Sequence, residues 1–286
     1  MDGTTEHREI VVGVDPSRDW HVALAWAVDE AHRRRAHLRL VVAVPPQHDT
    51  QHVDDTPRHT ALVLAGEEAL GRAALWAEAR RPGVEISTTV LDGFPARVIG
   101  GLSHEASMIV LGSRHLRRVE EFFSAGALVV PVTAQARCPV VVVGDTEHST
   151  QDPPYLVVGV DGSEASRAAV ALAFEEAALH HCDLRAIAVW QPPVFSLHTG
   201  ETMFQAERRQ LSEVTAGWSE KYPDVRVTHE ITVGSPVETL AEAAEHALAV
   251  VVGRRGRGGY TGMRVGSVVR GLLHRAHCPV ITVPAS

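Results

Sequence analysis

The chain has 286 residues, of which 45% are hydrophobic and 22% charged, with a formal net charge of −8 at pH 7. This length suits two domains of ordinary size, and the acidic balance argues against a nucleic-acid partner, which normally requires a basic face. No apolar run reaches the roughly 20 residues that span a bilayer, so we expect no membrane partner.

The first ten residues lack the basic and apolar regions of a signal peptide. Cys138, Cys182 and Cys278 are odd in number and have neither the spacing of a disulfide framework nor that of a zinc site. Their best explanation is buried packing rather than redox chemistry. We therefore expect a cytoplasmic protein with no metal ligands of its own.

An internal repeat runs through the chain. Residues 10–15 (IVVGVD) recur at 156–161 (LVVGVD), and three further segments recur in the same order. These are 28–38 with 174–184, 109–112 with 250–253, and 136–143 with 276–283. The duplication predicts domains at 1–146 and 155–286, joined by a polar, proline-bearing linker at 147–154.

Each copy alternates apolar runs with segments of helical period, which is typical of parallel βαβ units. In the second copy the pattern predicts strands at 156–161, 184–190, 225–232, 248–252 and 279–283, and helices at 163–181, 202–220, 236–246 and 267–276. The fold class is therefore α/β, with two tandem doubly wound domains, each a five-stranded parallel sheet flanked by helices. Such sheets bind ligands beyond the carboxyl ends of their strands.

Two residues at predicted strand ends are candidates for ligand contact. Asp161 ends the first strand of the second copy, where its carboxylate suits a ribose hydroxyl or a metal-bound water. The alternative is that Asp161 caps the following helix, with Ser163 as the competing cap. Val189 lies near the end of the second strand and either forms a wall beside an adenine or belongs to the core. Residues 235–238 (SPVE) predict a capping box at a helix start.

A glycine-rich loop follows the valine run at 250–252 and leads into a helix. Gly253 and Gly256 are separated by two residues, and nine more separate Gly256 from Gly266-Ser267. Glycines allow backbone N–H groups to face an anion, and a helix start adds unpaired donors and a positive dipole end. The loop matches neither the P-loop nor the Rossmann fingerprint. The alternative interpretation is a surface turn without a ligand.

This spacing resembles the ATP-binding signature of the universal stress protein family, and the resemblance covers nearly the whole chain as two consecutive copies. It implies a Rossmann-like fold of the adenine nucleotide alpha hydrolase type, with ATP and Mg²⁺ as the bound species. Carried over residue by residue, it implies a nucleotide site made by Asp161, Val189, Val252, Gly253, Gly256, Gly266, Ser267, Val268 and Val269. Arg254, Arg255 and Arg257 either add charge beside the phosphates or are simply solvated.

The first copy departs from this pattern at its loop. Asp15 and Gly112 are kept, but Pro16 follows the aspartate and His115 replaces the second glycine. Ala127 stands where the second copy has Ser267, after a loop one residue longer that ends at Gly126 and contains the acidic residues Glu120 and Glu121. We expect the first copy to bind nucleotide weakly or not at all.

The chain shows no nucleophile beside a base and no lysine at the loop, Lys221 being its only lysine. We therefore expect a nucleotide-responsive stress or regulatory module with no catalytic residues and at most weak ATPase activity. The alternatives are a slow ATP hydrolase and a nucleotide-free interaction protein. The resemblance also implies a homodimer formed through the last strands, at 140–143 and 280–283, and names no protein partner.

Overall fold

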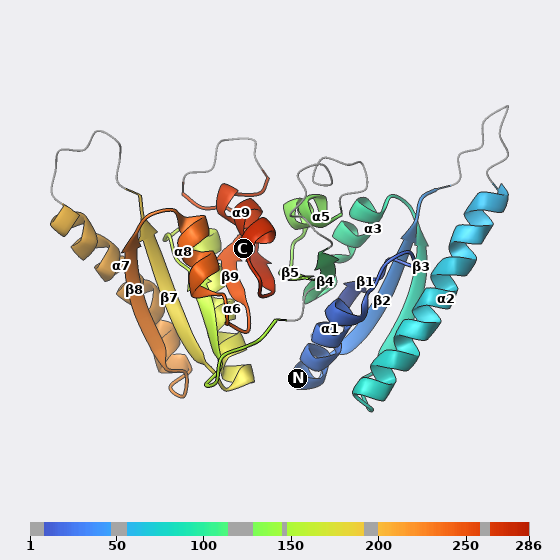
Figure 1. Cartoon of the computed structure of the whole chain (residues 1–286), viewed down its shortest axis with the longest axis horizontal. Coiled ribbons are helices and arrows are strands. Elements are labelled where there is room, and N and C mark those ends of the chain that lie inside the picture. Colours follow the sequence, from blue (N-terminus) through green and yellow to red (C-terminus); the bar gives the residue numbers. More distant parts are fainter. Residues whose placement is uncertain are drawn as a thin grey trace, which may run out of the picture. The chain divides into compact units, whose positions relative to one another are not determined.

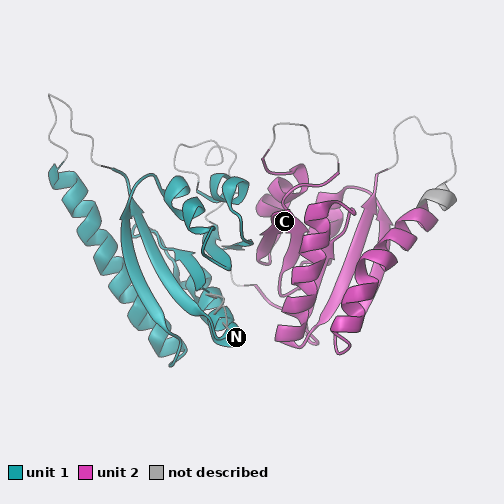
Figure 2. Cartoon of the chain, turned by 180° about the vertical axis from the view of Figure 1, so that it is seen from behind, with its two compact units in different colours: residues 1–115, 119–145 teal, residues 116–118, 146–286 magenta. Residues whose placement is uncertain are grey.

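A computed structural model describes residues 9–46, 56–113, 128–144, 148–191, 200–257 and 264–285. The chain divides into two compact units, coloured teal and magenta in Figure 2. Unit 1 contains the described residues up to 144 and unit 2 those from 148 onwards. Each unit is described below by itself.

Unit 1 alternates strands and helices along the chain (Figure 1). Its elements are β1 (Glu9–Gly13), α1 (His21–Arg34), β2 (His37–Val44), α2 (Thr56–Arg80), β3 (Ile86–Asp92), α3 (Pro95–Leu102), β4 (Met108–Ser113), α5 (Val129–Gln135) and β5 (Val140–Gly144).

Unit 2 repeats this order. Its elements are β6 (Tyr155–Gly159), α6 (Glu164–His180), β7 (Asp183–Trp190), α7 (Gly200–Lys221), β8 (Val227–Val233), α8 (Pro236–Ala243), β9 (Val250–Gly253), α9 (Ser267–Arg275) and β10 (Val280–Val283). All five predicted strands and all four predicted helices of the second copy are present.

The two sheets have the same strand order, β3-β2-β1-β4-β5 in unit 1 and β8-β7-β6-β9-β10 in unit 2. All described pairs within each sheet are parallel. In unit 2, α6 and α7 pack on one face while α8 and α9 pack on the other, and α1, α2, α3 and α5 divide in the same way in unit 1. This confirms the predicted fold class. The order reverses between β6 and β9, which is where a doubly wound sheet binds its ligand.

The central strands are buried on both faces, as their continuous apolar runs predict. Residues 250–252 of β9 and residues 155–158 of β6 are buried throughout. Phe174 of α6 is the largest side chain that is completely buried, and it lies in the layer between α6 and the sheet. The apolar core therefore holds β6 and β9 rigidly beside each other, and the chain beyond their ends is positioned by them.

Helix α8 corrects two details of the sequence prediction. It ends at Ala243 rather than at residue 246, because the Ala243 carbonyl accepts hydrogen bonds from Tyr155 Oη (3.0 Å) and Arg185 Nη1 (3.2 Å) instead of continuing the helix. Its start at Pro236 is as predicted, but Ser235 makes no side-chain cap hydrogen bond. Glu238 pairs with Arg275 of α9 across 2.9 Å, so the predicted capping box is wrong.

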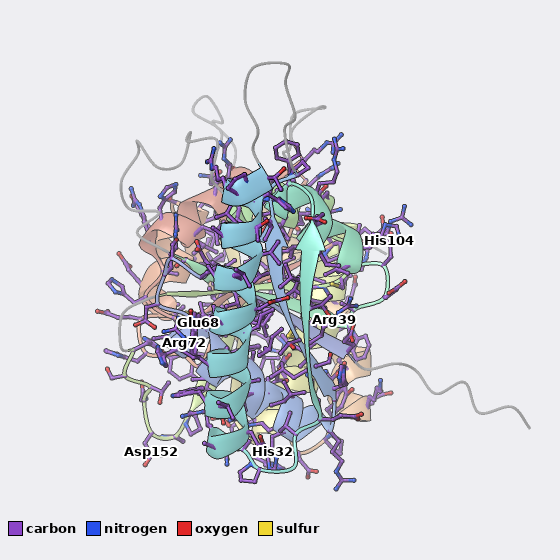
Figure 3. All side chains as sticks on the ribbon, turned by 90° about the vertical axis from the view of Figure 1, so that its right-hand side faces the viewer. His32, Arg39, Glu68, Arg72, His104 and Asp152 are labelled. Atoms are coloured by element: carbon purple, nitrogen blue, oxygen red, sulfur yellow. The ribbon has the colours of Figure 1, made fainter. Side chains whose placement is uncertain are left out.

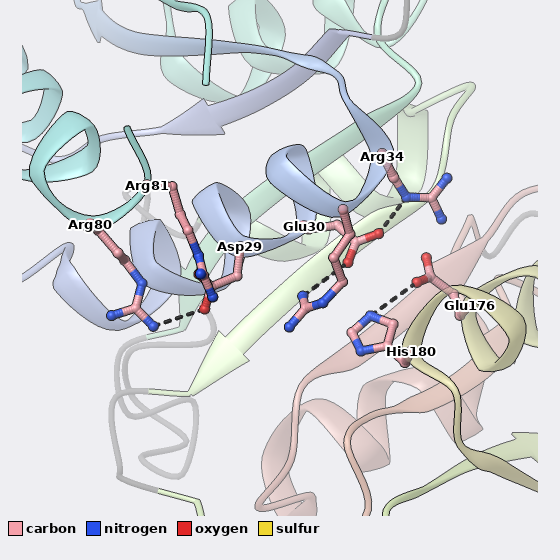
Figure 4. A network of polar contacts seen from close by, with 8 residues as sticks. Asp29, Glu30, Arg34, Arg80, Arg81, Glu176 and His180 are labelled. Atoms are coloured by element: carbon pink, nitrogen blue, oxygen red, sulfur yellow. Dashed lines mark hydrogen bonds and ion pairs between the residues drawn. The ribbon is translucent and has the colours of Figure 1, made fainter. Parts of the chain in front are cut away.

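Helix α2 covers β2 and β3 in unit 1 and carries exposed charged residues, among them Glu68 and Arg72 (Figure 3). Its end is joined to α1 by ion pairs from Arg80 and Arg81 to Asp29, at 2.8 and 2.7 Å (Figure 4). Partial burial acts to raise the pKa of Asp29, but hydrogen bonds from the two arginines outweigh it and lower the pKa below its ordinary value.

The repeat extends to buried acidic residues. Glu30 of α1 pairs with Arg34, and at the equivalent position of α6 Glu176 pairs with His180 across 3.6 Å (Figure 4).

Among the described residues, no helix combines the length and the apolar character needed to cross a membrane.

Candidate functional site

Unit 2 has a pocket of about 580 Å³ beyond the carboxyl ends of β6, β7 and β9. It lies at the point where the strand order reverses. The pocket is lined by all nine residues predicted from the sequence, together with others from α7, α8 and the strand ends. The fold therefore brings residues from positions 161 to 269 to one place.

One wall of the pocket is apolar. Val189 lies one residue before the end of β7, Val252 lies in β9, and Leu240 of α8 lines the same space. Gly159, at the end of β6, lets these side chains approach, because an added Cβ would lie 2.9 Å from Leu240 Cδ1 and 3.1 Å from Val252 Cγ1. A flat apolar group, such as a purine ring, suits this wall.

The glycine loop passes close to the start of α6. A Cβ on Gly253 would lie 2.7 Å from the carbonyl carbon of Ala165 and 2.8 Å from Ser166 N, both backbone atoms that cannot move aside. On Gly256 it would lie 2.3 Å from Asp161 Oδ2. These contacts explain why both positions are glycine. Gly258, Gly259 and Gly262 lie outside the described residues.

Helix α9 begins at the far end of this loop. Gly266 is its N-cap, and its N–H donates to the Arg254 carbonyl across 2.9 Å. The first backbone bond of the helix runs from Arg270 N to Gly266 O. Within the described part of the chain, the N–H groups of Ser267, Val268 and Val269 have no acceptor, and these residues line the pocket. Unpaired donors at the positive end of a helix bind anions.

Loop arginines surround this helix start. Arg255 and Arg257 line the pocket, whereas Arg254 is held by its backbone, whose N–H donates to the Val283 carbonyl across 2.7 Å. Burial, with a smaller contribution from the charge on Arg255, lowers the pKa of Arg254. Two of the three loop arginines are thus positioned to neutralise an anion in the pocket.

The structure decides between the two candidate caps of α6. Ser163 is the N-cap, since its Oγ accepts the Ser166 N–H across 3.2 Å. Asp161 instead accepts the Ser163 N–H on Oδ1 at 3.0 Å and the Arg257 N–H on Oδ2 at 2.9 Å. Its carboxylate therefore lines the pocket and also contacts the loop.

Sequence reasoning missed several lining residues. Ile187 and Gln191 lie two residues before and two residues after Val189, on the same face of β7 and its extension. A period of two starting from Val189 would therefore have indicated both. Glu207 lines the pocket from α7. No local sequence signal marks Glu207, because the tertiary packing of α7 against β7 brings it there.

The aspartate at the equivalent place in unit 1 is bound by residues of its own turn. The Asp15 carboxylate accepts the Ser17 N–H and hydroxyl on Oδ1, at 2.9 and 2.7 Å, and pairs with Arg18 across 2.8 Å. All these partners lie within three residues of Asp15. His115, Glu120, Glu121, Gly126 and Ala127 lie outside the described residues.

The three cysteines are buried, as predicted, and none forms a disulfide. Burial raises the pKa of each thiol to about 12. Since a thiol must ionise to act as a nucleophile or redox group, we expect all three to react slowly in the folded chain.

Known proteins resemble the chain over both units. The model of the universal stress protein family matches residues 6–144 and 155–284. Universal stress protein Rv2623 of Mycobacterium tuberculosis is 35% identical over 300 residues, which cover 97% of this chain and 96% of that protein. Universal stress protein Rv1996 of the same organism is 32% identical over 302 residues, covering 95% and 93%.

A solved structure shares the fold. The crystal structure of a universal stress protein from Archaeoglobus fulgidus matches with a TM-score of 0.76 over 98% of this chain and 97% of that one, at 19% sequence identity. At this identity the match supports the two-unit architecture alone.

Proposed function

The chain belongs to the universal stress protein family, and from that premise we propose that its second unit binds ATP and regulates a stress response through its nucleotide state. The observation that carries the proposal is the pocket at the β6–β9 reversal, where an apolar wall, a glycine loop and the start of α9 face one space. Its volume, about 580 Å³, is in the range of small-molecule sites.

Each part of the nucleotide has a proposed partner in this pocket. The adenine packs between Val189 and Val252, and the ribose lies near Asp161. The phosphates take the N–H groups at Gly256 and at Ser267 to Val269, with Arg255 and Arg257 supplying charge. Hydrogen bonds between ionised partners are about twice as strong as neutral ones, which favours a triphosphate over a neutral ligand.

In this proposal, Mg²⁺ binds together with the nucleotide phosphates and not at a preformed protein site. Both oxygens of Asp161 already accept backbone N–H bonds. Mg²⁺ is commonly bound by substrate phosphates with few protein carboxylates. When bound, it would neutralise phosphate charge, and the arginines of the loop would do the same from the protein side.

A slow ATP hydrolase is the alternative enzyme. Slow turnover of ATP that Asp161→Ala abolishes would favour this alternative over a binding module. A nucleotide-free interaction protein is the third possibility, and failure to bind any adenine nucleotide would favour it.

The proposal includes a cytoplasmic location and a homodimer formed through β5 and β10, the last strands of the two units in chain order. Sedimentation equilibrium tests the dimer, and a species with the 30.9 kDa mass of one chain at micromolar concentration would exclude it.

The decisive experiment is a calorimetric titration of the nucleotide-stripped protein with ATP and Mg²⁺. We expect one site per chain, because only unit 2 has the intact loop. Two sites would show that unit 1 tolerates its departures from the signature. No binding would overturn the proposal and favour the interaction protein.

A further inference from the structure

We propose that Asp161 is a positioning residue that holds the first part of the glycine loop, residues 253–257, in its ligand-binding shape before any nucleotide arrives. This inference rests on the proposed function for its effect on binding, but not for the structural role itself. It differs from the ribose contact proposed above, because it assigns the carboxylate to the protein's own backbone.

The evidence is a pair of bonds between two segments far apart in sequence. Asp161 Oδ2 accepts the Arg257 N–H at 2.9 Å, and Oδ1 accepts the Ser163 N–H at 3.0 Å. A second link runs beside it, since Ser163 Oγ donates to the Arg255 carbonyl across 3.3 Å. The turn after β6 thus holds the loop after β9 at two residues, Arg255 and Arg257, which flank Gly256.

The loop has a glycine at the position that contacts this carboxylate. Gly256 leaves room for it, since a Cβ there would lie 2.3 Å from Asp161 Oδ2. Arg257 also reaches back over the turn, and its Nη2 lies 2.1 Å from the position that a Cβ on Gly162 would take. Gly162 has a φ of +73°, a conformation that suits glycine.

Such a link has a large effect on a glycine-rich segment. Glycine has more conformational freedom to lose than any other residue, so a free loop would resist forming an N–H cradle. A charged acceptor bound to the Arg257 N–H fixes the first part of the loop, residues 253–257, in advance, so that nucleotide binding need not order that part.

Unit 1 provides the contrast. Asp15 is the repeat equivalent of Asp161, but its carboxylate is bound by Ser17 and by Arg18 within its own turn. Asp161 also accepts the N–H of the serine two residues on, as Asp15 does, but in addition it joins the turn after β6 to the loop after β9. The equivalent loop of unit 1, residues 114–127, lies outside the described residues.

The positioning role and the ribose role predict opposite signs for one measurement. Inorganic tripolyphosphate has phosphates but no ribose or base. If Asp161 serves only the ribose, Asp161→Asn leaves tripolyphosphate affinity unchanged or raises it, because a negative charge near the anion is removed. If Asp161 positions the loop, the affinity falls, because an amide can accept only one of the two N–H bonds through its oxygen and its NH₂ group faces the other.

The experiment titrates nucleotide-stripped wild type, Asp161→Asn and the matched variant Asp15→Asn with tripolyphosphate and with ATP. We expect Asp161→Asn to weaken tripolyphosphate about tenfold, the equivalent of losing one hydrogen bond to a charged group, and to weaken ATP at least as much. Asp15→Asn should change neither. Unchanged or tighter tripolyphosphate binding by Asp161→Asn would overturn the positioning role.

A second readout needs no ligand. Amide hydrogen exchange, followed by NMR on the nucleotide-free protein, should show the Arg257 amide protected in the wild type and exchanging at least about tenfold faster in Asp161→Asn. Equal exchange in the two proteins would overturn the inference. If the wild type binds neither ligand but the Arg257 exchange differs as expected, the proposed function fails while the positioning role stands.

Discussion

Gly112 and Gly253 lie at equivalent positions near the ends of β4 and β9, but the space beside them differs. An added Cβ on Gly112 would make an ordinary contact, 3.7 Å from Ala23 Cβ, whereas on Gly253 it would lie 2.7 Å from the Ala165 backbone. The start of α6 therefore approaches the end of β9 more closely than the start of α1 approaches the end of β4. Unit 2 needs its glycine for steric reasons.

The first prediction follows from this contrast. Gly253→Ala should lower the free energy of unfolding by about 1–3 kcal/mol, the usual cost of forcing an extra carbon into a packed site. Gly112→Ala should change it by no more than about 0.5 kcal/mol. Urea unfolding of the two variants measures both values. Equal losses would contradict the difference in packing between the repeats.

The second prediction concerns the loop glycine at the start of α9. Gly266→Val should abolish ATP binding, because a branched side chain would stand beside the N–H groups of Ser267 and Val268, and even a Cβ lies 3.3 Å from the Arg254 carbonyl. Gly126→Val in the first repeat should leave the affinity unchanged. Calorimetry with ATP checks both, and equal losses would show that the two repeats do not differ as proposed.

A third prediction concerns the ion pairs of Asp29 with Arg80 and Arg81. The folded chain lowers the pKa of Asp29, so these pairs stabilise the protein above the ordinary carboxyl pKa and the effect is lost as the pH falls through the folded-state value. Asp29→Asn should cost at most about 1 kcal/mol at pH 7, because the pairs are partly exposed.

The pH dependence tests this cause. The difference in Tm between wild type and Asp29→Asn should be constant above about pH 5 and shrink towards zero below about pH 3. A difference that persists unchanged at low pH would mean that Asp29 acts through packing instead.

The fourth prediction concerns the thiols. Because burial raises the pKa of Cys138, Cys182 and Cys278 to about 12, a disulfide reagent at pH 8 should label none of them in the native protein. All three should react in guanidinium chloride. Rapid labelling of any one in the native state would show that its surroundings open.

Periodicity and repetition predicted every strand and helix of unit 2, because the buried strands have continuous apolar runs and the helices have clear starts. The ends were less predictable. Strand β6 stops at Gly159, two residues before Asp161, and α8 stops where Tyr155 and Arg185 bind its last carbonyl. Both donors come from strands that precede α8 by some fifty residues or more, so no local pattern contains them.

The residues of the candidate site were also predicted only in part. The motif spacing and the strand ends predicted nine residues that line one pocket, while their role in nucleotide binding stays a prediction. Glu207 was missed because it reaches the pocket through the packing of α7. The bond from Arg257 to Asp161 was missed because it joins two loops that meet only when β6 lies beside β9.

The pairing of β6 with β9 also sets how long β6 waits for its partner strand during synthesis. Val157 of β6 pairs with Val250 of β9. Roughly ninety residues must therefore leave the ribosome after β6 before β9 can cover the edge of β6 that faces away from β7. This takes about 5–20 s at ordinary translation rates. Until then β6 can pair only with β7, and an open apolar strand edge is a site for misassembly. The same holds in unit 1, where Val11 of β1 pairs with Ile109 of β4. Neighbouring chains on one messenger RNA would meet in these intervals, so the folding yield of both units should depend on translation rate and on chaperones.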